Sequence, residues 1–316
     1  MSLRVLVLGA SGTAGAAASK ALAADGHQLV FVLRPGAAAP VAGEIVRADP
    51  SDSARFYDAV LGAAPDAIVS CLASRTGTAQ DAWNIDHDAH VTALEAAQAA
   101  GVRQFVLLSA LCVQRPMLEF QRAKLAFEDR LMQSGLIYSI VRPTAFFKSL
   151  SGQVARVQAG KPFLVFGDGR MTACKPISDG DLGDYIAGCL NDPARANRIL
   201  PIGGPGPALT PLDQAAILSE LLGREVPVRR VPVALMSAII GGMALAGLVH
   251  PRARDRAEFA RIGRYYGTQS MLVWDDALGR YSAEATPEFG SDTLRDHYAA
   301  LLAGDAEAAL GAHGAF

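Results

Sequence analysis

The segment from Arg4 to Arg34, which opens with Arg4-Val-Leu-Val-Leu-Gly-Ala-Ser-Gly-Thr-Ala-Gly15, carries the strongest signal for the fold. Residues 5–8 form a continuous apolar run, which predicts a strand buried on both faces of a parallel sheet. The alanine-rich segment 13–24 predicts a helix, and the apolar run 29–33 predicts a second strand. The chain is therefore expected to begin with a β-α-β unit.

Three glycines stand at a fixed spacing between that first strand and the helix. Gly9 permits a tight turn, Gly12 lets the backbone approach a phosphate, and Gly15 lets the helix pack close to the sheet. This context makes the glycine pattern a dinucleotide-binding fingerprint, with Ser11 and Thr13 in contact with the cofactor. The alternative is a glycine-rich loop of an α/β protein that binds nothing.

Arg34 stands at the end of the second predicted strand. NAD-preferring sites usually carry a carboxylate there for the ribose 2′-hydroxyl, whereas a guanidinium pairs with a 2′-phosphate. The position therefore favours NADP(H). The alternative is a solvated arginine at a strand end.

Composition narrows the class of protein. The chain has 316 residues, is 51% hydrophobic, and carries a net charge of −2 without a lysine-rich run, so nucleic acid is not an expected partner. Its four cysteines are scattered, which argues against a zinc site and against disulfides. Met1 leads directly into the first strand and leaves no room for a signal peptide, so we expect a cytoplasmic protein.

Strands and helices alternate through the first half of the chain. Further strands are expected at 44–47, 67–71, 105–109 and 137–141, and helices at 81–100 and 117–133. This alternation predicts an α/β fold, a Rossmann-like doubly wound parallel sheet with a smaller C-terminal substrate lobe. We expect an NADP(H)-binding domain over 1–143, a substrate lobe over 144–302 interwoven with the last core strands, and a flexible tail over 303–316. A helix is expected at 146–158 within the lobe.

The segment 233–249 is the most hydrophobic part of the chain and carries no charge. Its 17 residues fall short of the ~20 that a transmembrane helix needs, so no bilayer span is expected. Three alternatives stay open: a buried helix, an apolar wall of a large ligand pocket, or a face that touches a membrane peripherally.

A second group of residues concerns catalysis. Ser109 ends the predicted fifth strand and Lys124 lies on the following helix. Short-chain dehydrogenases place a serine there, followed by a Tyr-x-x-x-Lys helix whose tyrosine protonates a carbonyl oxygen. This chain has Phe120 at the tyrosine position, so ordinary ketone–alcohol chemistry is doubtful. Lys124 can still hold the nicotinamide ribose, and the alternative is a solvated helix lysine.

Longer motifs carry a closer resemblance. They are Phe120-Gln-Arg-Ala-Lys-Leu125, Arg142-Pro-Thr-Ala-Phe-Phe-Lys-Ser149, Cys174-Lys-Pro-Ile-Ser178 and Leu200-Pro-Ile-Gly-Gly-Pro-Gly206, with 262–266 and 286–290 further on. Together they resemble the divinyl (proto)chlorophyllide 8-vinyl reductases over nearly the whole chain. The resemblance implies an NADPH-dependent oxidoreductase of (bacterio)chlorophyll synthesis that reduces the 8-vinyl group of a magnesium tetrapyrrole to ethyl. A vinyl group has no oxygen to protonate, which accounts for phenylalanine at position 120.

We assign the candidate site residues accordingly. Catalytic roles fall to Lys124 and Ser109. Cofactor contacts are expected from Gly9, Ser11, Gly12, Thr13, Gly15, Arg34, Asp49, Cys71, Leu72, Ser109, Lys124 and Pro143. Substrate contacts are expected from Phe120, Phe146, Phe147, Lys148 and Lys175, and no metal site is expected.

These substrate contacts have alternatives. Phe146 and Phe147 would offer a flat apolar surface or belong to an ordinary core. Lys148, Lys175 or Arg142 would pair with a substrate propionate or be surface charges. Two other functions also stay open: a non-catalytic NADP(H)-sensing regulator or assembly factor on the same fold, and a different alkene or quinone reductase.

Overall fold

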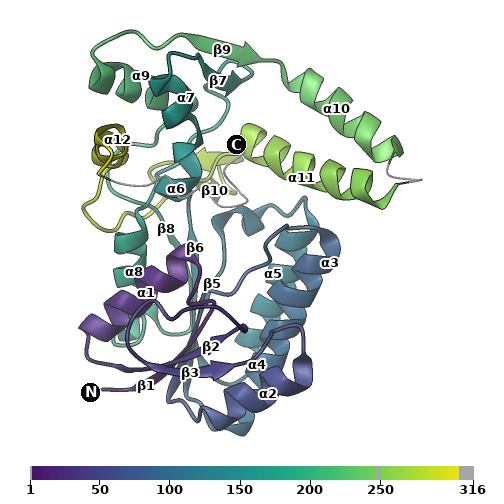
Figure 1. Cartoon of the computed structure of the whole chain (residues 1–316), viewed down its shortest axis with the longest axis vertical. Coiled ribbons are helices and arrows are strands. Elements are labelled where there is room, and N and C mark those ends of the chain that lie inside the picture. The colour runs from purple at the N-terminus through teal and green to yellow at the C-terminus, as the bar shows by residue number, and fades with distance from the viewer. Residues whose placement is uncertain (1, 247–249, 306–316) are drawn as a thin grey trace. The chain divides into compact units, whose positions relative to one another are not determined.

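The computed structural model describes residues 2–246 and 250–305. Its main feature is a seven-stranded sheet with the strand order β3-β2-β1-β4-β5-β6-β8 (Figure 1). The strands are β1 (Arg4–Leu8), β2 (Gln28–Leu33), β3 (Glu44–Arg47), β4 (Ala67–Ser70), β5 (Gln104–Leu108), β6 (Ile137–Pro143) and β8 (Arg198–Ile202). Neighbouring strands from β3 to β6 pair in parallel. The order reverses between β1 and β4, which confirms the doubly wound sheet.

Helices cover both faces of this sheet. The helices α1 (Thr13–Ala24) and α8 (Asp179–Gly188) lie on one face, and α2 (Ser53–Gly62), α4 (His90–Ala99) and α5 (Glu119–Met132) lie on the other (Figure 1). A core of buried side chains joins the second group to the strands, centred on Phe56, Phe105 and Phe127. On the first face, a Cβ at Gly183 would lie 2.7 Å from the backbone of Ala17. The close approach of α1 and α8 therefore requires glycine there.

The chain divides into two compact units. The first unit comprises residues up to 75, then 79–143 and 179–201, and the second comprises 76–78, 144–178 and the chain from 202 onward. The chain thus leaves the first unit after Pro143, and returns to it for α8 and β8.

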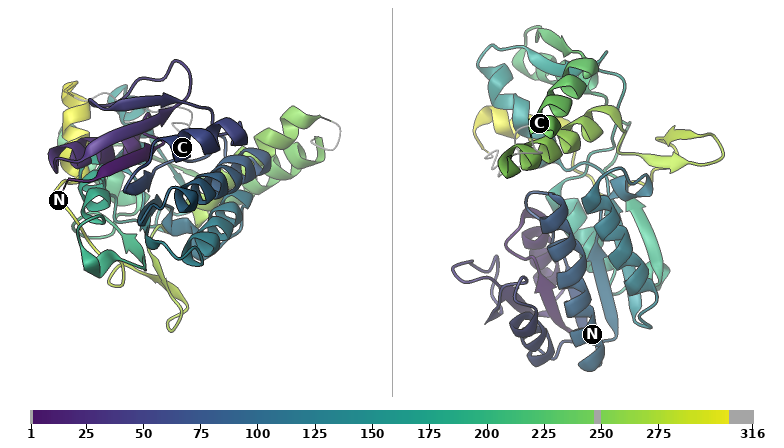
Figure 2. Two further views of the ribbon diagram at one scale, coloured as in Figure 1. Left: turned by 90° about the horizontal axis from the view of Figure 1, so that it is seen from below. Right: turned by 90° about the vertical axis from the view of Figure 1, so that its right-hand side faces the viewer.

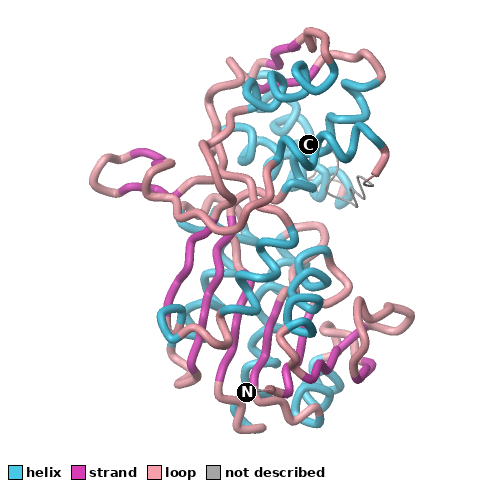
Figure 3. Tube along the Cα trace, turned by 90° about the vertical axis from the view of Figure 1, so that its left-hand side faces the viewer, coloured by secondary structure: helices cyan, strands magenta, loops and turns pink. Residues whose placement is uncertain are grey.

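The second unit combines short helices with two small sheets. Its elements are α6 (Phe147–Leu150), α7 (Val154–Gln158), β7 (Phe163–Phe166), α9 (Pro211–Leu222), β9 (Val228–Val231), α10 (Val233–Ala246), α11 (Pro251–Thr268), β10 (Val273–Asp275), β11 (Arg280–Ser282) and α12 (Leu294–Ala303). β7 and β9 pair in parallel. β10 and β11 form an antiparallel hairpin that extends away from the helices of this unit (Figures 2 and 3). Buried apolar side chains, Leu218 and Tyr298 among them, form its core.

Two expected helices are interrupted. The helix expected at 81–100 consists of α3 (Ala79–Ala82), a π-helical segment (Trp83–Ala89) and α4. In the widened turn, the carbonyl oxygen of Ile85 lies 2.9 Å from Nδ1 of His90, so a side chain satisfies a backbone acceptor. The helix expected at 146–158 is interrupted by a 3₁₀ turn at Ser151–Gln153. There the Ser151 hydroxyl donates to the carbonyl oxygen of Phe147, a local bond of the kind that bends helices.

The interpretation of 233–249 as a buried helix is wrong for the described part. Within α10, Leu235, Ile239 and Leu245 are 52%, 51% and 71% exposed, whereas Ile240 is buried. Residues 247–249 lie outside the described residues, as do 306–316 of the expected tail. None of the helices in the described residues is long and apolar enough to cross a bilayer.

Candidate active site

The glycine loop joins β1 to α1 at the carboxyl edge of the sheet. Gly9 has φ +74°, and a Cβ there would lie 2.6 Å from the backbone of Cys71. A Cβ at Gly15 would lie 2.2 Å from the carbonyl oxygen of Gly9. The backbone itself therefore requires both glycines, one for the turn and one for close packing.

Gly12 differs from its two neighbours in the pattern. Its φ is −82°, and a Cβ there would meet only the carbonyl oxygen of Gly9 at 3.4 Å, an ordinary contact. Gly12 is also the N-cap of α1, where no side chain caps the helix and the first turn carries no acid. The first turn of a helix directs backbone amides and the positive end of the helix dipole toward an anion, and a phosphate close to the backbone would account for glycine. The loop, with exposed Ser11 and half-buried Thr13, therefore fits a dinucleotide pyrophosphate.

A cavity of about 550 Å³ opens beyond the carboxyl ends of β2 and β3. Arg34, Pro35, Ala37, Asp49 and Arg75 line it. Two arginines thus line one cavity, an arrangement that suits a doubly charged phosphate. Sequence reasoning missed Arg75, because it belongs to no motif. What could have indicated Arg75 is its position shortly after β4, at the carboxyl edge of the sheet where β2 and β3 also end.

Neighbouring groups hold this cavity in shape. Nη1 of Arg47 donates to the carbonyl oxygens of Arg34 and Ala37, at 3.0 and 2.6 Å. The backbone amide and hydroxyl of Ser51 donate to Asp49, and these bonds, assisted by the charge of Arg34, hold the pKa of the Asp49 carboxyl below its usual range. Asp49 is therefore ionised at neutral pH beside the two arginines.

The other expected cofactor residues follow β4 and β6. Cys71 donates its backbone amide to the carbonyl oxygen of Leu8 at 2.9 Å, and half-buried Leu72 comes next. Burial raises the pKa of the Cys71 thiol to about 12, so the thiol stays protonated and is a poor nucleophile. Pro143 is buried at the end of β6.

Lys124 on α5 is ion-paired inside the first unit. Its Nζ lies 2.9 Å from Oδ1 of Asp86 in the π-helical segment, and only 12% of its side chain is exposed. The same Asp86 oxygen accepts the backbone amide of Ser74 at 3.2 Å. The alternative of a solvated helix lysine is therefore wrong. Sequence reasoning missed Asp86, because the π-helical turn that directs it inward has no sequence signature.

His90 completes this buried group. Its Nδ1 lies 2.9 Å from the carbonyl oxygen of Ile85, and its Nε2 lies 2.8 Å from the Ser70 hydroxyl. A carbonyl can only accept, so Nδ1 carries the proton and the Ser70 hydroxyl donates to Nε2. Burial, and next the charge of Lys124, lower the pKa of His90 to about 4. The imidazole is neutral at pH 7, and Lys124 is the cation that balances Asp86.

Ser109 belongs to a second buried ion pair. Its hydroxyl donates to Glu128, which is fully buried and also pairs with the guanidinium of Arg142. A proton transfer through Ser109 would have to compete with this bond. Arg142 was a candidate partner for a substrate propionate, and a propionate would have to displace Glu128 from its guanidinium group.

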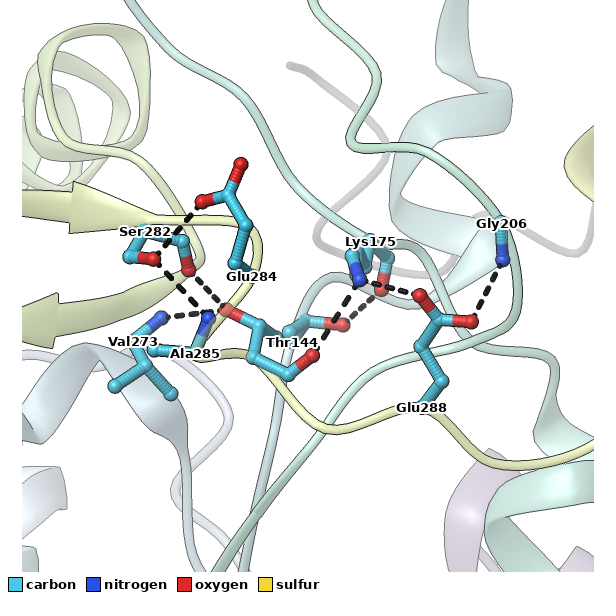
Figure 4. A network of polar contacts seen from close by, with 9 residues as sticks. Thr144, Lys175, Gly206, Val273, Ser282, Glu284, Ala285 and Glu288 are labelled. Carbon is cyan, nitrogen blue, oxygen red and sulfur yellow. Dashed lines mark hydrogen bonds and ion pairs between the residues drawn. The ribbon is translucent and has the colours of Figure 1, made fainter.

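Lys175 lies in a polar network of the second unit (Figure 4). Its Nζ is ion-paired with Glu288 and lies 3.4 Å from the carbonyl oxygen of Thr286, and its side chain is 8% exposed. Glu288 also accepts the amide of Gly206 at 3.2 Å. The bond from Lys175 holds the pKa of the Glu288 carboxyl below its usual range. Lys175 is thus neither a surface charge nor a free cation, and a substrate carboxylate would have to displace Glu288.

The expected aromatic contacts are distributed over both units. Phe120 is buried on α5 of the first unit. Phe147 is buried in the core of the second unit, with its ring centroid 5.3 Å from that of His297, so the alternative of ordinary core packing is correct for Phe147. Phe146 and Lys148, on either side of it, are half-buried.

Among the described residues, no group of three or more histidine, cysteine, aspartate or glutamate side chains could hold a metal ion.

Comparisons with known proteins agree with this geometry. Residues 9–193 match the model of a family described as NAD(P)H-binding. The NADPH complex of an NADPH-dependent quinone oxidoreductase from Escherichia coli has a TM-score of 0.66 at 19% identity, covering 94% of this chain and 99% of that one, which shows the fold alone. The sheet order, the glycine loop and the family match define a Rossmann-type NAD(P)H-binding protein.

Two plant proteins identify the family more narrowly. The chloroplastic divinyl chlorophyllide a 8-vinyl-reductase of Oryza sativa subsp. indica is 46% identical over 316 residues, which cover 94% of this chain and 78% of that protein. The protein of the same name from Arabidopsis thaliana is 51% identical over 248 residues, which cover 77% of this chain and 60% of that protein. The chain belongs to the divinyl chlorophyllide a 8-vinyl-reductase family.

Proposed function

We propose that this protein uses NADPH to reduce the 8-vinyl group of divinyl chlorophyllide a, or of its protochlorophyllide counterpart, to an ethyl group. The observation that carries the proposal is the likeness to reductases of this name over 94% of the chain. The residue at position 120 supports it, because Phe120 cannot supply the proton that a ketone reductase of this fold needs.

The choice of NADPH rests on charge. The loop around Gly12 would hold the pyrophosphate, and Arg34 and Arg75 would pair with the 2′-phosphate in the cavity that they line. Asp49 adds one negative charge to this cavity, against the two positive charges of Arg34 and Arg75. When bound, the cofactor supplies the hydride for the two-electron reduction.

Lys124 is the residue that would hold the nicotinamide ribose. Its ammonium group is fixed by Asp86, so little side-chain entropy is lost when a ligand binds to it. The reaction also needs one proton at the inner vinyl carbon. Ser109 is less suited to supply it, because its hydroxyl already donates to Glu128.

The pigment would be received by the second unit. Phe147 is buried in the core of this unit, whereas Phe146 is half-buried. Phe146 can therefore offer an apolar surface to a flat macrocycle.

The cytoplasmic location of this protein stays a prediction.

The test is a reaction of the purified protein with NADPH and divinyl chlorophyllide a, and in parallel with divinyl protochlorophyllide a. Loss of one conjugated double bond should move the Soret band of the product to shorter wavelength, and its mass should increase by two hydrogen atoms. Binding of NADPH without oxidation by either pigment would instead support a cofactor-sensing protein. Oxidation by a quinone and by neither pigment would support a different reductase.

A further inference from the structure

The helix α10 presents an apolar face to solvent. None of its 14 residues is charged, and Leu235, Ile239 and Leu245 are each more than half exposed. Leu235 and Ile239 lie one turn apart, so they share a face of the helix. On its other side, α10 is paired with α11. A helix on the surface of a globular protein ordinarily turns polar residues outward, so this arrangement marks an interaction surface.

The segment around α10 is rich in arginine. Residues 224–264 contain eight arginines against three acidic residues, in a chain whose net charge is −2. Arg229 and Arg230 on β9 are exposed directly before α10, and Arg256, Arg261 and Arg264 are exposed on α11. An apolar helix with guanidinium groups on the elements before and after it is the pattern of a helix that lies in the interface of an anionic membrane.

We propose that α10, together with the arginines of β9 and α11, docks this protein on the surface of a lipid bilayer with anionic headgroups. The apolar face would lie at the boundary between headgroups and acyl chains, and the arginines would pair with lipid phosphates. The 14 residues of α10 span ~21 Å, less than the ~30 Å of a hydrocarbon core, so the helix would lie in the interface rather than cross it.

Charge favours a bilayer over a second copy of the chain. A symmetric dimer through α10 would bring two arginine-rich segments toward each other, whereas anionic headgroups neutralise them. The inference does not depend on the reaction proposed above, since it rests only on exposure and charge within the second unit.

The experiment measures binding of the full-length protein to vesicles by flotation. Phosphatidylcholine vesicles are compared with vesicles that also contain phosphatidylglycerol. We expect binding to the anionic vesicles only, and a partition coefficient at least about tenfold lower for the double variant Leu235→Glu/Ile239→Glu. Arg229→Gln/Arg230→Gln should remove the preference for the anionic lipid, and added salt should weaken binding.

A matched control is Leu278→Glu, since Leu278 is 59% exposed near the β10–β11 hairpin and lies outside the basic segment. This variant should bind anionic vesicles as the wild type does. Each change is at an exposed position, and circular dichroism with thermal unfolding reports whether each variant is folded. Failure of the wild type to float with either vesicle, or equal losses for Leu278→Glu, would overturn the proposal. A dimer that Leu235→Glu/Ile239→Glu dissociates would assign the face to a second copy instead.

Discussion

Nζ of Lys124 lies 2.9 Å from Oδ1 of Asp86, and the second oxygen of that carboxylate has no hydrogen-bond partner among the described residues. The pair joins α5 to a π-helical turn 38 residues earlier in the chain. Both side chains are largely buried, so removing either charge leaves the other uncompensated. The ion pair therefore has two effects: it stabilises the first unit, and it fixes the position of the Lys124 ammonium group.

Asp86→Asn tests both effects. The variant keeps the shape of the side chain but removes its charge, so we expect the free energy of unfolding to fall by about 3 kcal/mol and the Kd for NADPH to rise. Denaturant unfolding and cofactor titration measure the two effects. Asp88→Asn is the control, because that side chain is 63% exposed. An Asp86→Asn protein with wild-type stability and cofactor affinity would contradict both.

Lys124→Met tests the role of the ammonium group in cofactor binding. Methionine fills similar space without charge, so the NADPH concentration at half-maximal rate should rise by at least about tenfold, which corresponds to the loss of one charged hydrogen bond. Steady-state kinetics measures it. Lys20→Met, at an exposed position of α1, is the matched control. Wild-type kinetics for Lys124→Met would show that the lysine serves stability alone.

Phe120→Tyr asks whether the missing tyrosine matters. Phe120 is only 8% exposed, so an added hydroxyl would be buried, at a cost of about 1–3 kcal/mol if it finds no partner. We expect no faster vinyl reduction and a lower melting temperature. Reduction rates and thermal unfolding measure the outcome, and a faster enzyme would show that a proton donor at this position assists the reaction.

Arg34→Gln and Arg75→Gln test the assignment of the cavity that they line. Each variant should raise the Kd for NADPH by about tenfold or more while the Kd for NADH changes little, because only NADPH carries the 2′-phosphate. The double variant should lose most of the discrimination. Arg103→Gln is the control, since its side chain is 71% exposed and lies outside the cavity. Equal Kd ratios in wild type and variants would remove both arginines from the site.

His90 predicts a specific dependence of stability on pH. Its pKa is lowered to about 4 in the folded protein, against 6.5 in an unfolded chain. Between these values the unfolded state binds a proton that the folded state does not, so stability should fall as pH decreases from 6.5 toward 4, by up to about 1.4 kcal/mol per pH unit. His90→Gln should make this fall smaller. Unfolding free energies at pH 7 and pH 5 measure it, and an unchanged slope would exclude His90 as its source.

Much of the first unit could be predicted from the sequence. Apolar runs and glycine spacing depend on neighbours in the chain, and they predicted the β1–α1–β2 unit and the doubly wound sheet. The same local signals failed at 81–100, where the periodicity indicated one helix and the structure has a π-helical turn. That turn depends on contacts of His90 and Asp86 with residues distant in sequence, which no local pattern contains.

The fold class, the glycine loop and the family could all be predicted from the sequence, because each depends on residue order along the chain. The pairing of the charged side chains could not be predicted from the sequence and follows from the folded structure. Lys124, Arg142 and Lys175 are alike in sequence as candidate cations, yet each side chain is largely buried and pairs with a carboxylate. The partners Asp86, Glu128 and Glu288 lie 14 to 113 residues away. Burial makes such pairing necessary, because an unpaired charge inside a protein is costly, and only the folded chain brings the partners together.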